Sequence, residues 1–280
     1  MTRLFPSRLA LTIGDRRSFL LLAIIYALSS ATSHAADAKH LLRYKFEMGE
    51  VLRYRVEHRA HVNTRIDETS QEVESTTESV KAWKVTDVLP GGEIEFIHMV
   101  ESARMTNRRP QHDVAEFDSR DEGEPPPFFA AAARSIGVPL TLIRMTPTGE
   151  IVRREEKHPQ PKVTEDMPIT MRLPDKAVAV GAKWSQSYDV SAQRKSGAQI
   201  KIKTRRLCKL ESVKAGIAVI SVDYQILTPV DPYVKSQLVE RLTAGTVRFD
   251  IERGRIVAEE QRQERLMKPG EKLAARTAAK

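Results

Sequence analysis

Side chains that could bind a metal or catalyse a reaction are thinly spread along this chain. His58 and His61 stand three residues apart in "HRAH", and imidazole pairs are common zinc ligands. On a helix this spacing would put both rings on one face. The surrounding residues alternate as in a strand, so the rings should point to opposite faces, one inward and one outward. We therefore expect no metal at this pair.

A second group is acidic. The stretch "DSRDEGE" carries Asp118, Asp121, Glu122 and Glu124. Calcium needs several convergent oxygens, and the D-x-D-x-D-G spacing of calcium loops is absent. We expect a solvated acidic loop here and no tightly bound metal in the protein.

Cys208 is the only cysteine in 280 residues, so no intrachain disulfide can form. In "RRLCKLE" it is best read as a small apolar residue buried in a strand, with a reactive thiol as the alternative. His98 lies in an apolar strand and should be a hydrogen-bonded core residue rather than a base. The G-x-S-x-G, H-E-x-x-H, P-loop and Rossmann motifs are all absent. We therefore assign no catalytic, cofactor-binding or metal-ligating residue, and no cofactor.

The first 35 residues have the pattern of a secretory signal peptide. Arginines come first, the apolar run Phe19–Ala31 follows, and Ser33 and Ala35 supply small residues for cleavage after Ala35. A retained membrane anchor is the alternative, but the run is short for a bilayer, which needs about 20 apolar residues. "DRRSFLL" resembles a twin-arginine signal, whereas the strongly apolar run suits the general secretory route, so both routes stay open.

Charge argues against a nucleic-acid partner. The net charge is +8, and the leader holds four Arg and one Asp, or +3, which leaves about +5 (8 − 3) on the mature chain. Both signs are mixed along the sequence, as on an ordinary solvated surface.

The body of the chain reads as antiparallel strands. In "VLRYRVEHRAHV" (Val51–Val62) apolar and charged residues alternate with the period of a half-buried strand. Residues 67–79 could be a long hairpin loop or an exposed strand. Strand pairs at 80–105 and 139–155 flank a polar loop at 107–127 and a short helix at Phe128–Gly137.

The same order then recurs. "MTPTGEIVRRE" (145–155) and "FDIERGRIVAE" (249–259) carry a similar phrase with a glycine turn. The glycine-then-aromatic strand at 178–190 matches the one before His58, with Trp184 in the position of Leu52. A strand pair at 199–227 and a helix at Asp231–Gly245 follow, with Asp231 as its N-cap. The helices should turn Phe128, Phe129 and Ile136, and Val234, Leu238 and Leu242, toward their sheets.

These patterns predict an α+β fold that is mostly antiparallel β. Two similar curved meander sheets should each carry one short helix. The predicted organisation is a signal peptide at 1–35, a first repeat domain at 36–157 and a linker at 158–175. A second repeat domain at 176–267 and a disordered tail at 268–280 complete it.

Two stretches carry a family resemblance. "PDKAVAVGAKWSQSY" and "GTVRFDIERGRIVAEE" resemble an uncharacterised family of exported bacterial proteins with strand-rich repeats, over about Leu41–Met267. The motifs are structural, so no activity and no functional residue follows from them. A fainter resemblance is to the periplasmic lipoprotein-carrier superfamily, in which a sheet curls around helices to form an apolar pocket.

We expect an exported, periplasmic or extracellular protein that binds or scaffolds at the cell envelope without catalysis. A carrier of an apolar or lipid ligand in a sheet–helix pocket is the alternative, and an enzyme with an unrecognised site is a third reading. The partner would be an envelope protein, a polymer or an apolar ligand. Nucleic acid and a stable membrane span after cleavage are not expected.

The leader pattern makes a direct prediction. The mature protein should begin at Ala36 and be recovered in soluble form, because the small residues Ser33 and Ala35 suit signal peptidase. N-terminal sequencing of the exported protein checks this. Recovery of the Met1 or Thr2 start in the membrane fraction would show that the leader is an anchor.

Overall fold

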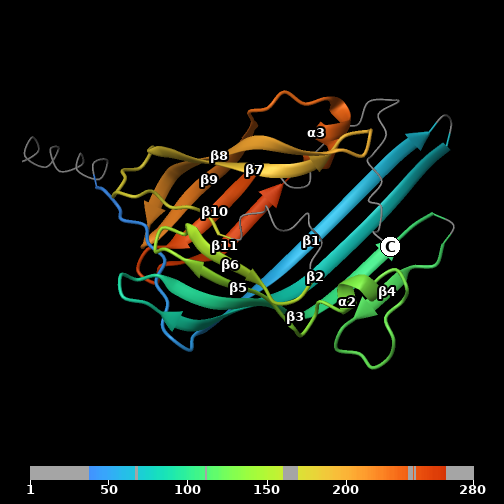
Figure 1. Cartoon of the computed structure of the whole chain (residues 1–280), viewed down its shortest axis with the longest axis horizontal. Helices are drawn as coiled ribbons and strands as arrows, with labels where there is room; N and C mark the ends of the chain where they lie inside the picture. Colours follow the sequence, from blue (N-terminus) through green and yellow to red (C-terminus); the bar gives the residue numbers. More distant parts are fainter. Residues whose placement is uncertain are drawn as a thin grey trace, which may run out of the picture. The chain divides into compact units, whose positions relative to one another are not determined.

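A computed structural model describes residues 38–66, 69–110, 112–159, 170–238, 242 and 244–262. Contacts divide the chain into Met1–Lys39 and His40–Lys280, and the second unit is the subject here. The predicted signal peptide (1–35) and tail (268–280) lie outside the described residues. Figure 1 labels the helices and strands along the chain.

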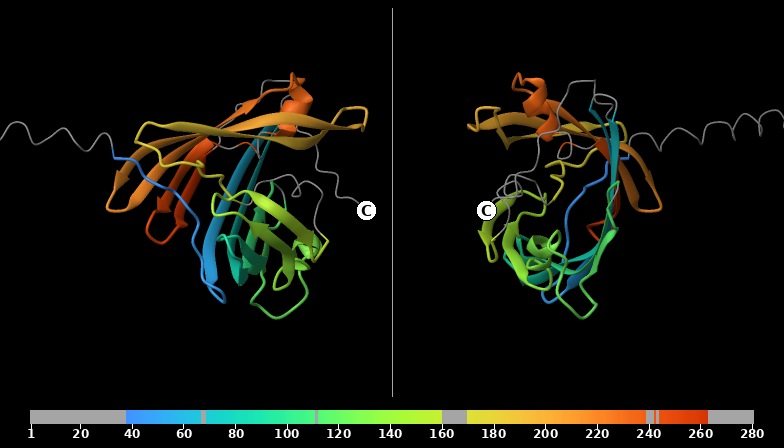
Figure 2. Two further views of the ribbon diagram at one scale, coloured as in Figure 1. Left: turned by 60° about the vertical axis from the view of Figure 1, so that its left-hand side comes forward. Right: turned by 90° about the vertical axis from the view of Figure 1, so that its right-hand side faces the viewer.

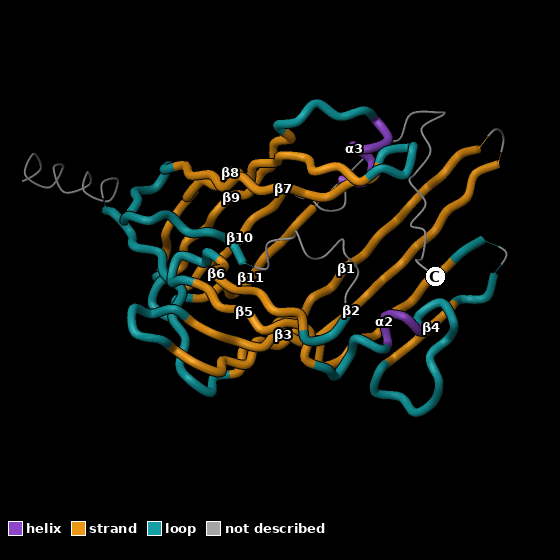
Figure 3. The backbone as a smooth tube through the Cα atoms, viewed as in Figure 1, coloured by secondary structure: helices purple, strands orange, loops and turns teal. Residues whose placement is uncertain are grey.

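All the described strands belong to two antiparallel sheets (Figures 1 and 3). Sheet 1 has the order β1-β2-β3-β5-β6, and β4 pairs with β3; sheet 2 has the order β11-β10-β9-β8-β7. The strands of sheet 1 are β1 (Val51–Ile66), β2 (Thr69–Val88), β3 (Ile94–Arg108), β4 (Ala115–Asp118), β5 (Pro139–Met145) and β6 (Ile151–Glu156). Those of sheet 2 are β7 (Lys183–Gln193), β8 (Gln199–Lys214), β9 (Ile217–Ile226), β10 (Ala244–Asp250) and β11 (Arg255–Arg262).

The two sheets follow the same path through the chain. In each, a helix stands between the third strand and the closing hairpin: α2 (Ala130–Ala133) in sheet 1, where β4 comes between β3 and the helix, and α3 (Pro232–Leu238) in sheet 2. The mostly antiparallel fold and the two similar sheets, each with a short helix, are thus confirmed.

The likeness extends to irregular positions in the ladders. Gly49 and Gly181 both have positive φ and stand two residues before the first strand of their sheet. Gly49 donates its N–H to Val85 of the neighbouring strand, and Gly181 donates to Leu210, which occupies the matching place. A bulge follows each acceptor, between Val85 and Asp87 in one sheet and between Leu210 and Ser212 in the other. The two sheets are therefore similar in these irregular positions as well as in strand order.

Both helices are shorter than predicted. The helix expected over Phe128–Gly137 covers only Ala130–Ala133, and Phe128 is exposed while Phe129 is buried. Asp231 caps α3 as predicted, because its Oδ1 accepts the Val234 N–H at 3.0 Å. Gly245, expected to end that helix, lies in β10 and pairs with Val222. Alanine propensity alone does not extend α2, since tertiary contacts override propensity in so short a segment.

Two polar stretches form strands. Residues 69–79 belong to β2 and pair with residues 56–66 of β1, so this stretch is a strand rather than a loop. Glu72, Glu74 and Glu78 are exposed, whereas Ser79 is buried. Within the expected loop at 107–127, Ala115–Asp118 pairs with β3 as β4.

One continuous apolar core joins the inner faces of both sheets. Its buried members, the shared core, are Leu42, Tyr44, Phe46, Leu52, Trp83, Val85, Ile94, Phe96, Ile143, Met145, Met171, Leu173, Cys208, Leu210, Ala218, Ile220, Val247 and Phe249. The two repeats therefore stabilise one another, because apolar surface of each is covered by the other.

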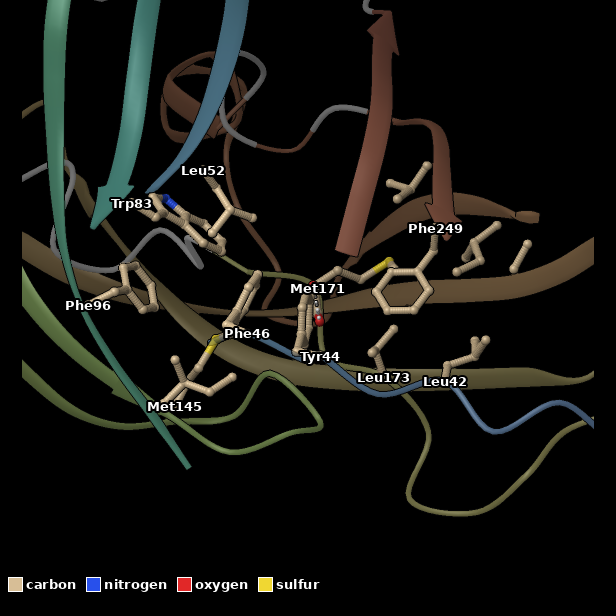
Figure 4. Close-up of a cluster of buried hydrophobic side chains, with 14 of the residues drawn as sticks. Leu42, Tyr44, Phe46, Leu52, Trp83, Phe96, Met145, Met171, Leu173 and Phe249 are labelled. Atoms are coloured by element: carbon tan, nitrogen blue, oxygen red, sulfur yellow. Dashed lines mark hydrogen bonds between the residues drawn. The ribbon is translucent and has the colours of Figure 1, made fainter. Parts of the chain in front are cut away.

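The segment Leu42–Phe46, which we call the leading segment, lies between the two closing hairpins. The Tyr44 N–H donates to Pro147 O in the β5–β6 turn, and the Lys45 N–H donates to Gly254 O in the β10–β11 turn. Two aromatic rings of the leading segment connect the sheets through ring contacts. Tyr44 contacts Phe249 of sheet 2 and Phe46, and Phe46 contacts Trp83 of sheet 1 (Figure 4). In Figure 2 the blue leading segment can be followed to the start of β1.

The stretch assigned to a linker also ends inside the core. Thr170, Met171 and Leu173 are buried, and the Leu173 N–H donates to Thr148 O of the β5–β6 turn. The Thr170 hydroxyl donates to Gly149 O at 2.7 Å. Residues 170–173 thus pack against the closing hairpin of sheet 1, ahead of the first strand of sheet 2.

A smaller cluster holds α3. Val234 and Leu238 are buried against Val190, Ala192 and Ile202 of β7 and β8. On β8, Ile202 shares its alternation with Cys208 and Leu210 of the shared core, so α3 covers the same face of sheet 2. The predicted apolar stripe of this helix is confirmed at both buried positions.

The two hairpin glycines generate a stability prediction. A Cβ at Gly149 would lie 2.6 Å from Met171 O, and one at Gly254 would lie 2.6 Å from Arg43 O, at positive φ in both cases. Gly149→Ala and Gly254→Ala should each lower the free energy of unfolding by about 3 kcal/mol or more, through backbone strain and a clash that flexible side chains cannot relieve. Urea denaturation measures the loss.

Gly216→Ala is the matched control. Its φ is +76°, but nothing lies within 4 Å of an added Cβ, so only the conformational cost of about 1 kcal/mol applies. Equal losses in the three variants would show that the leading segment does not press against the hairpin turns.

Candidate functional site

Beyond the shared core, the inner faces of the sheets carry polar side chains. Lys81 and His98 from sheet 1 and Tyr188, Arg206 and Tyr224 from sheet 2 make up this group, which we call the polar layer. Each position follows from strand alternation. Lys81 shares its face of β2 with Trp83, and Arg206 shares its face of β8 with Cys208.

Arg206 is the most buried charged residue of the polar layer. It is 9 % exposed. Its Nε donates to the Tyr224 hydroxyl at 2.8 Å, and its Nη1 donates to Thr170 O at 3.2 Å. The guanidinium carbon also lies 5.4 Å from the centre of the Tyr224 ring. All of these partners are formally neutral.

No carboxylate within the described part of the chain forms an ion pair with Arg206. Burial by itself would lower the pKa of this guanidinium, but Tyr224 and Tyr188 more than offset that effect, so the pKa is raised and the charge is kept. A buried charge that lacks an opposite charge is costly, by several kcal/mol in general.

Tyr188 and Gln186 add buried polar atoms that are not satisfied. Tyr188 Oη and Gln186 Oε1 are buried and have no hydrogen-bond partner of normal geometry. Burial is the main reason that the pKa of Tyr188 is raised, so the hydroxyl keeps its proton. The neighbouring Thr204 is satisfied, because its hydroxyl donates to Tyr188 O.

Sheet 1 places a second base at the matching position. Lys81 precedes the β2 bulge acceptor Val85 by four residues, and Arg206 precedes its counterpart Leu210 by four. Burial lowers the pKa of Lys81, and Glu259 of β11 partly offsets this. Glu259 also raises the pKa of Tyr224.

Burial and nearby positive charges both lower the pKa of His98. Its pKa is lowered to about 4, first by burial and then by Lys81 and Arg154. The imidazole is therefore neutral at pH 7. The hydrogen bond predicted for it is not found among the described residues, where His98 pairs only through its backbone with Trp83 and Thr141.

Cys208 has the structural role predicted for it. It is 4 % exposed in the shared core, and burial raises the pKa of its thiol to about 11. Because the thiolate is the reactive form, a thiol protonated at pH 7 is a poor nucleophile.

The acidic stretch divides into two parts. Asp118 is not solvated as predicted: it lies at the end of β4 with 8 % exposure, and Arg120 holds its carboxylate in a bidentate pair that lowers its pKa. Pairing of β4 with β3 buries it. Asp121, Glu122 and Glu124 are exposed as predicted.

His58 and His61 of β1 are both exposed, so the prediction that one of them points inward is wrong. His61 Nε2 lies 3.0 Å from Glu72, and its Nδ1 lies 3.6 Å from Glu74. These three residues are the described group whose ligand atoms could converge on a metal. Each ring nitrogen faces its own carboxylate, which is the geometry of an ion pair rather than of a ring that binds a metal through one nitrogen.

Sequence reasoning missed the polar layer. The sequence did contain one indication of it. Arg206 alternates with the inward-facing residues Thr204 and Cys208 of β8, where an apolar residue would be expected. Lys81 similarly shares the phase of Trp83. A charged residue in an inward phase marks an exception to the strand pattern.

Comparison with protein-family models, curated proteins and solved structures finds no match to this chain. The resemblance to exported bacterial proteins therefore remains an expectation from the sequence. Among the described residues, no helix has the length and apolar character needed to cross a bilayer.

His98 predicts the effect of acid on stability. Its folded pKa of about 4 lies below the unfolded value of 6.5, so between these values the unfolded chain binds more protons. The free energy of unfolding should fall as pH is lowered from about 6.5 to 4, by up to about 3 kcal/mol from this group. His98→Gln should flatten that part of the profile in urea titrations at stepped pH.

The exposed His58→Gln is the control and should leave the slope unchanged. An unaltered profile in His98→Gln would contradict the prediction and show that the imidazole is solvated.

Proposed function

We propose that this chain is an exported, non-catalytic binding protein of the bacterial cell envelope, with the polar layer as its recognition site. The observation that carries the proposal is a buried guanidinium, Arg206, without an ion pair in the described part of the chain, beside the unsatisfied Tyr188 hydroxyl. Unmet polar capacity at one buried place is what a binding site provides for its ligand.

The shared core supports this by making the site rigid. Arg206 and Lys81 stand two residues from the core members Cys208 and Trp83, so packed side chains fix the start of each polar stretch. In the proposal the sheets are the curved meanders that the sequence predicts, and their curvature turns both polar stretches toward one ligand. Binding to a preorganised site costs less conformational entropy.

The chemistry of the polar layer favours binding over catalysis. Its thiol neighbour Cys208 is protonated, and its imidazole, His98, has a pKa too low for a general base near neutrality. In the described residues these groups form no nucleophile–base hydrogen bond. Tyrosine and arginine, the remaining groups, are common in recognition sites.

The reading as a carrier with a sheet–helix pocket is less well supported. The described contact between α3 and sheet 2 is filled by the protein's own side chains, since Val234, Leu238, Val190 and Ile202 are each 0–1 % exposed. Packing of this kind leaves the polar layer as the favoured place for a ligand.

Native mass spectrometry tests the proposal. Protein recovered from the exported fraction of a bacterial host should carry a bound small molecule or envelope component, absent after unfolding in urea and refolding in buffer. A mass equal to the bare chain in both samples, together with turnover of a hydrolase substrate panel, would show that the protein is an enzyme instead.

A further inference from the structure

We propose that Arg206 anchors an oxyanion, the carboxylate or phosphate group of a ligand, with the Tyr188 hydroxyl as a second donor. This inference rests on the binding function proposed above and names the chemistry of its ligand. Arg206 is nine-tenths buried, and the buried Tyr188 Oη makes no hydrogen bond of normal geometry within the described residues.

Arg206 has N–H donors that its described contacts do not use. A guanidinium carries five N–H donors in a planar fork, and the described contacts use Nε toward Tyr224 and Nη1 toward Thr170. The remaining donors include both on Nη2, so one side of the fork is free to make paired bonds to two oxygens. Carboxylate and phosphate are the groups whose oxygens match this geometry.

The neighbouring strand supplies further contacts. Tyr188 Oη lies beside Thr204 and Tyr224 but makes no hydrogen bond of normal geometry to a described residue, so its proton can be donated to an oxyanion. Gln186 Oε1, two residues away on the same face, is also buried without a donor. Turning this amide about its last torsion would present an N–H in place of the oxygen, since the two orientations are nearly equal in shape.

The surrounding charge favours an anion. Lys81, Arg154 and Arg206 bring positive charge to the polar layer, where Lys81 and Arg154 are both felt by His98. Glu259 acts on the same region through Lys81 and Tyr224.

A purely structural role explains Arg206 less well. An apolar side chain at position 206 would extend the shared core. Replacing buried charged residues with apolar ones often leaves the stability of a protein unchanged or raises it. Its counterpart strand again has a base, Lys81, at the matching position. For Arg206, which forms no ion pair in the described part of the chain, a ligand is a better explanation than packing.

The test is calorimetric titration of the full-length exported protein with acetate, inorganic phosphate, dodecanoate and dodecyl phosphate, followed also by tryptophan fluorescence. Trp184 lies two residues from Gln186 and should report occupancy. We expect wild-type protein to bind at least one of these oxyanions. Tighter binding of the dodecyl compounds identifies an amphiphile headgroup as the source, and equal binding identifies a free anion.

Variants separate recognition from packing. Arg206→Gln should weaken binding about 20-fold or more, and Arg206→Lys, which keeps the charge but loses the fork, about 5-fold. Tyr188→Phe should weaken binding about 3- to 10-fold without lowering the thermal midpoint, because it removes an unsatisfied hydroxyl. Arg205→Gln, on the opposite face of β8, makes the same charge change and should bind as wild type.

Three outcomes would overturn the oxyanion proposal. The first is binding that is unchanged in both Arg206→Lys and Tyr188→Phe. The second is the absence of binding of all four oxyanions to the wild-type protein. The third is a neutral co-purified ligand whose binding ignores Arg206; in that case the broader binding function would stand.

Discussion

The leading segment lies between two hairpin turns and makes backbone hydrogen bonds to both. Tyr44 bonds to the turn of sheet 1 and Lys45 to the turn of sheet 2, so adjacent residues connect the two halves of the molecule. Glycine suits both turns because φ is positive and there is no room for a Cβ: at 149 it would clash with Met171 O and the Tyr44 ring, and at 254 with the backbone of Arg43 and Lys45. Side chains of Leu42, Tyr44 and Phe46 then fill the space between the inner faces.

This arrangement determines where apolar packing ends. The aromatic contacts from Phe249 to Trp83 and on to Phe96 cross the interior near the hairpin turns. Each buried ring or aliphatic side chain contributes about 2 kcal/mol of transfer free energy. Along β2 and β8 the next inward positions are Lys81 and Arg206, where the interior changes from apolar to basic within one step of strand alternation.

The two repeats have the same backbone plan and different chemistry. Leu52 corresponds to Trp184, and Trp83 to Cys208, so the large and small side chains are exchanged between strands. The basic position is kept in both, but Arg206 is surrounded by tyrosines while Lys81 stands near His98. Two similar sheets with unlike linings make an asymmetric interior, which would suit the proposed ligand with one charged end.

The sequence by itself determined the strands, their hairpins and the repetition, because a period of two and a glycine at a tight turn are local properties. It also predicted the α3 cap and stripe, whose residues lie within three turns of one helix. It did not predict β4, the burial of Asp118 or the entry of residues 170–173 into the core. Each of these features depends on contacts with another segment of the chain, namely β3 for β4 and Asp118, and the β5–β6 turn for residues 170–173. Local propensity does not predict such contacts. The site was decided in the same way. The strand alternation puts Arg206 and Lys81 in phase with apolar residues, but only the packing of the two sheets on one shared core shows that this face is inside.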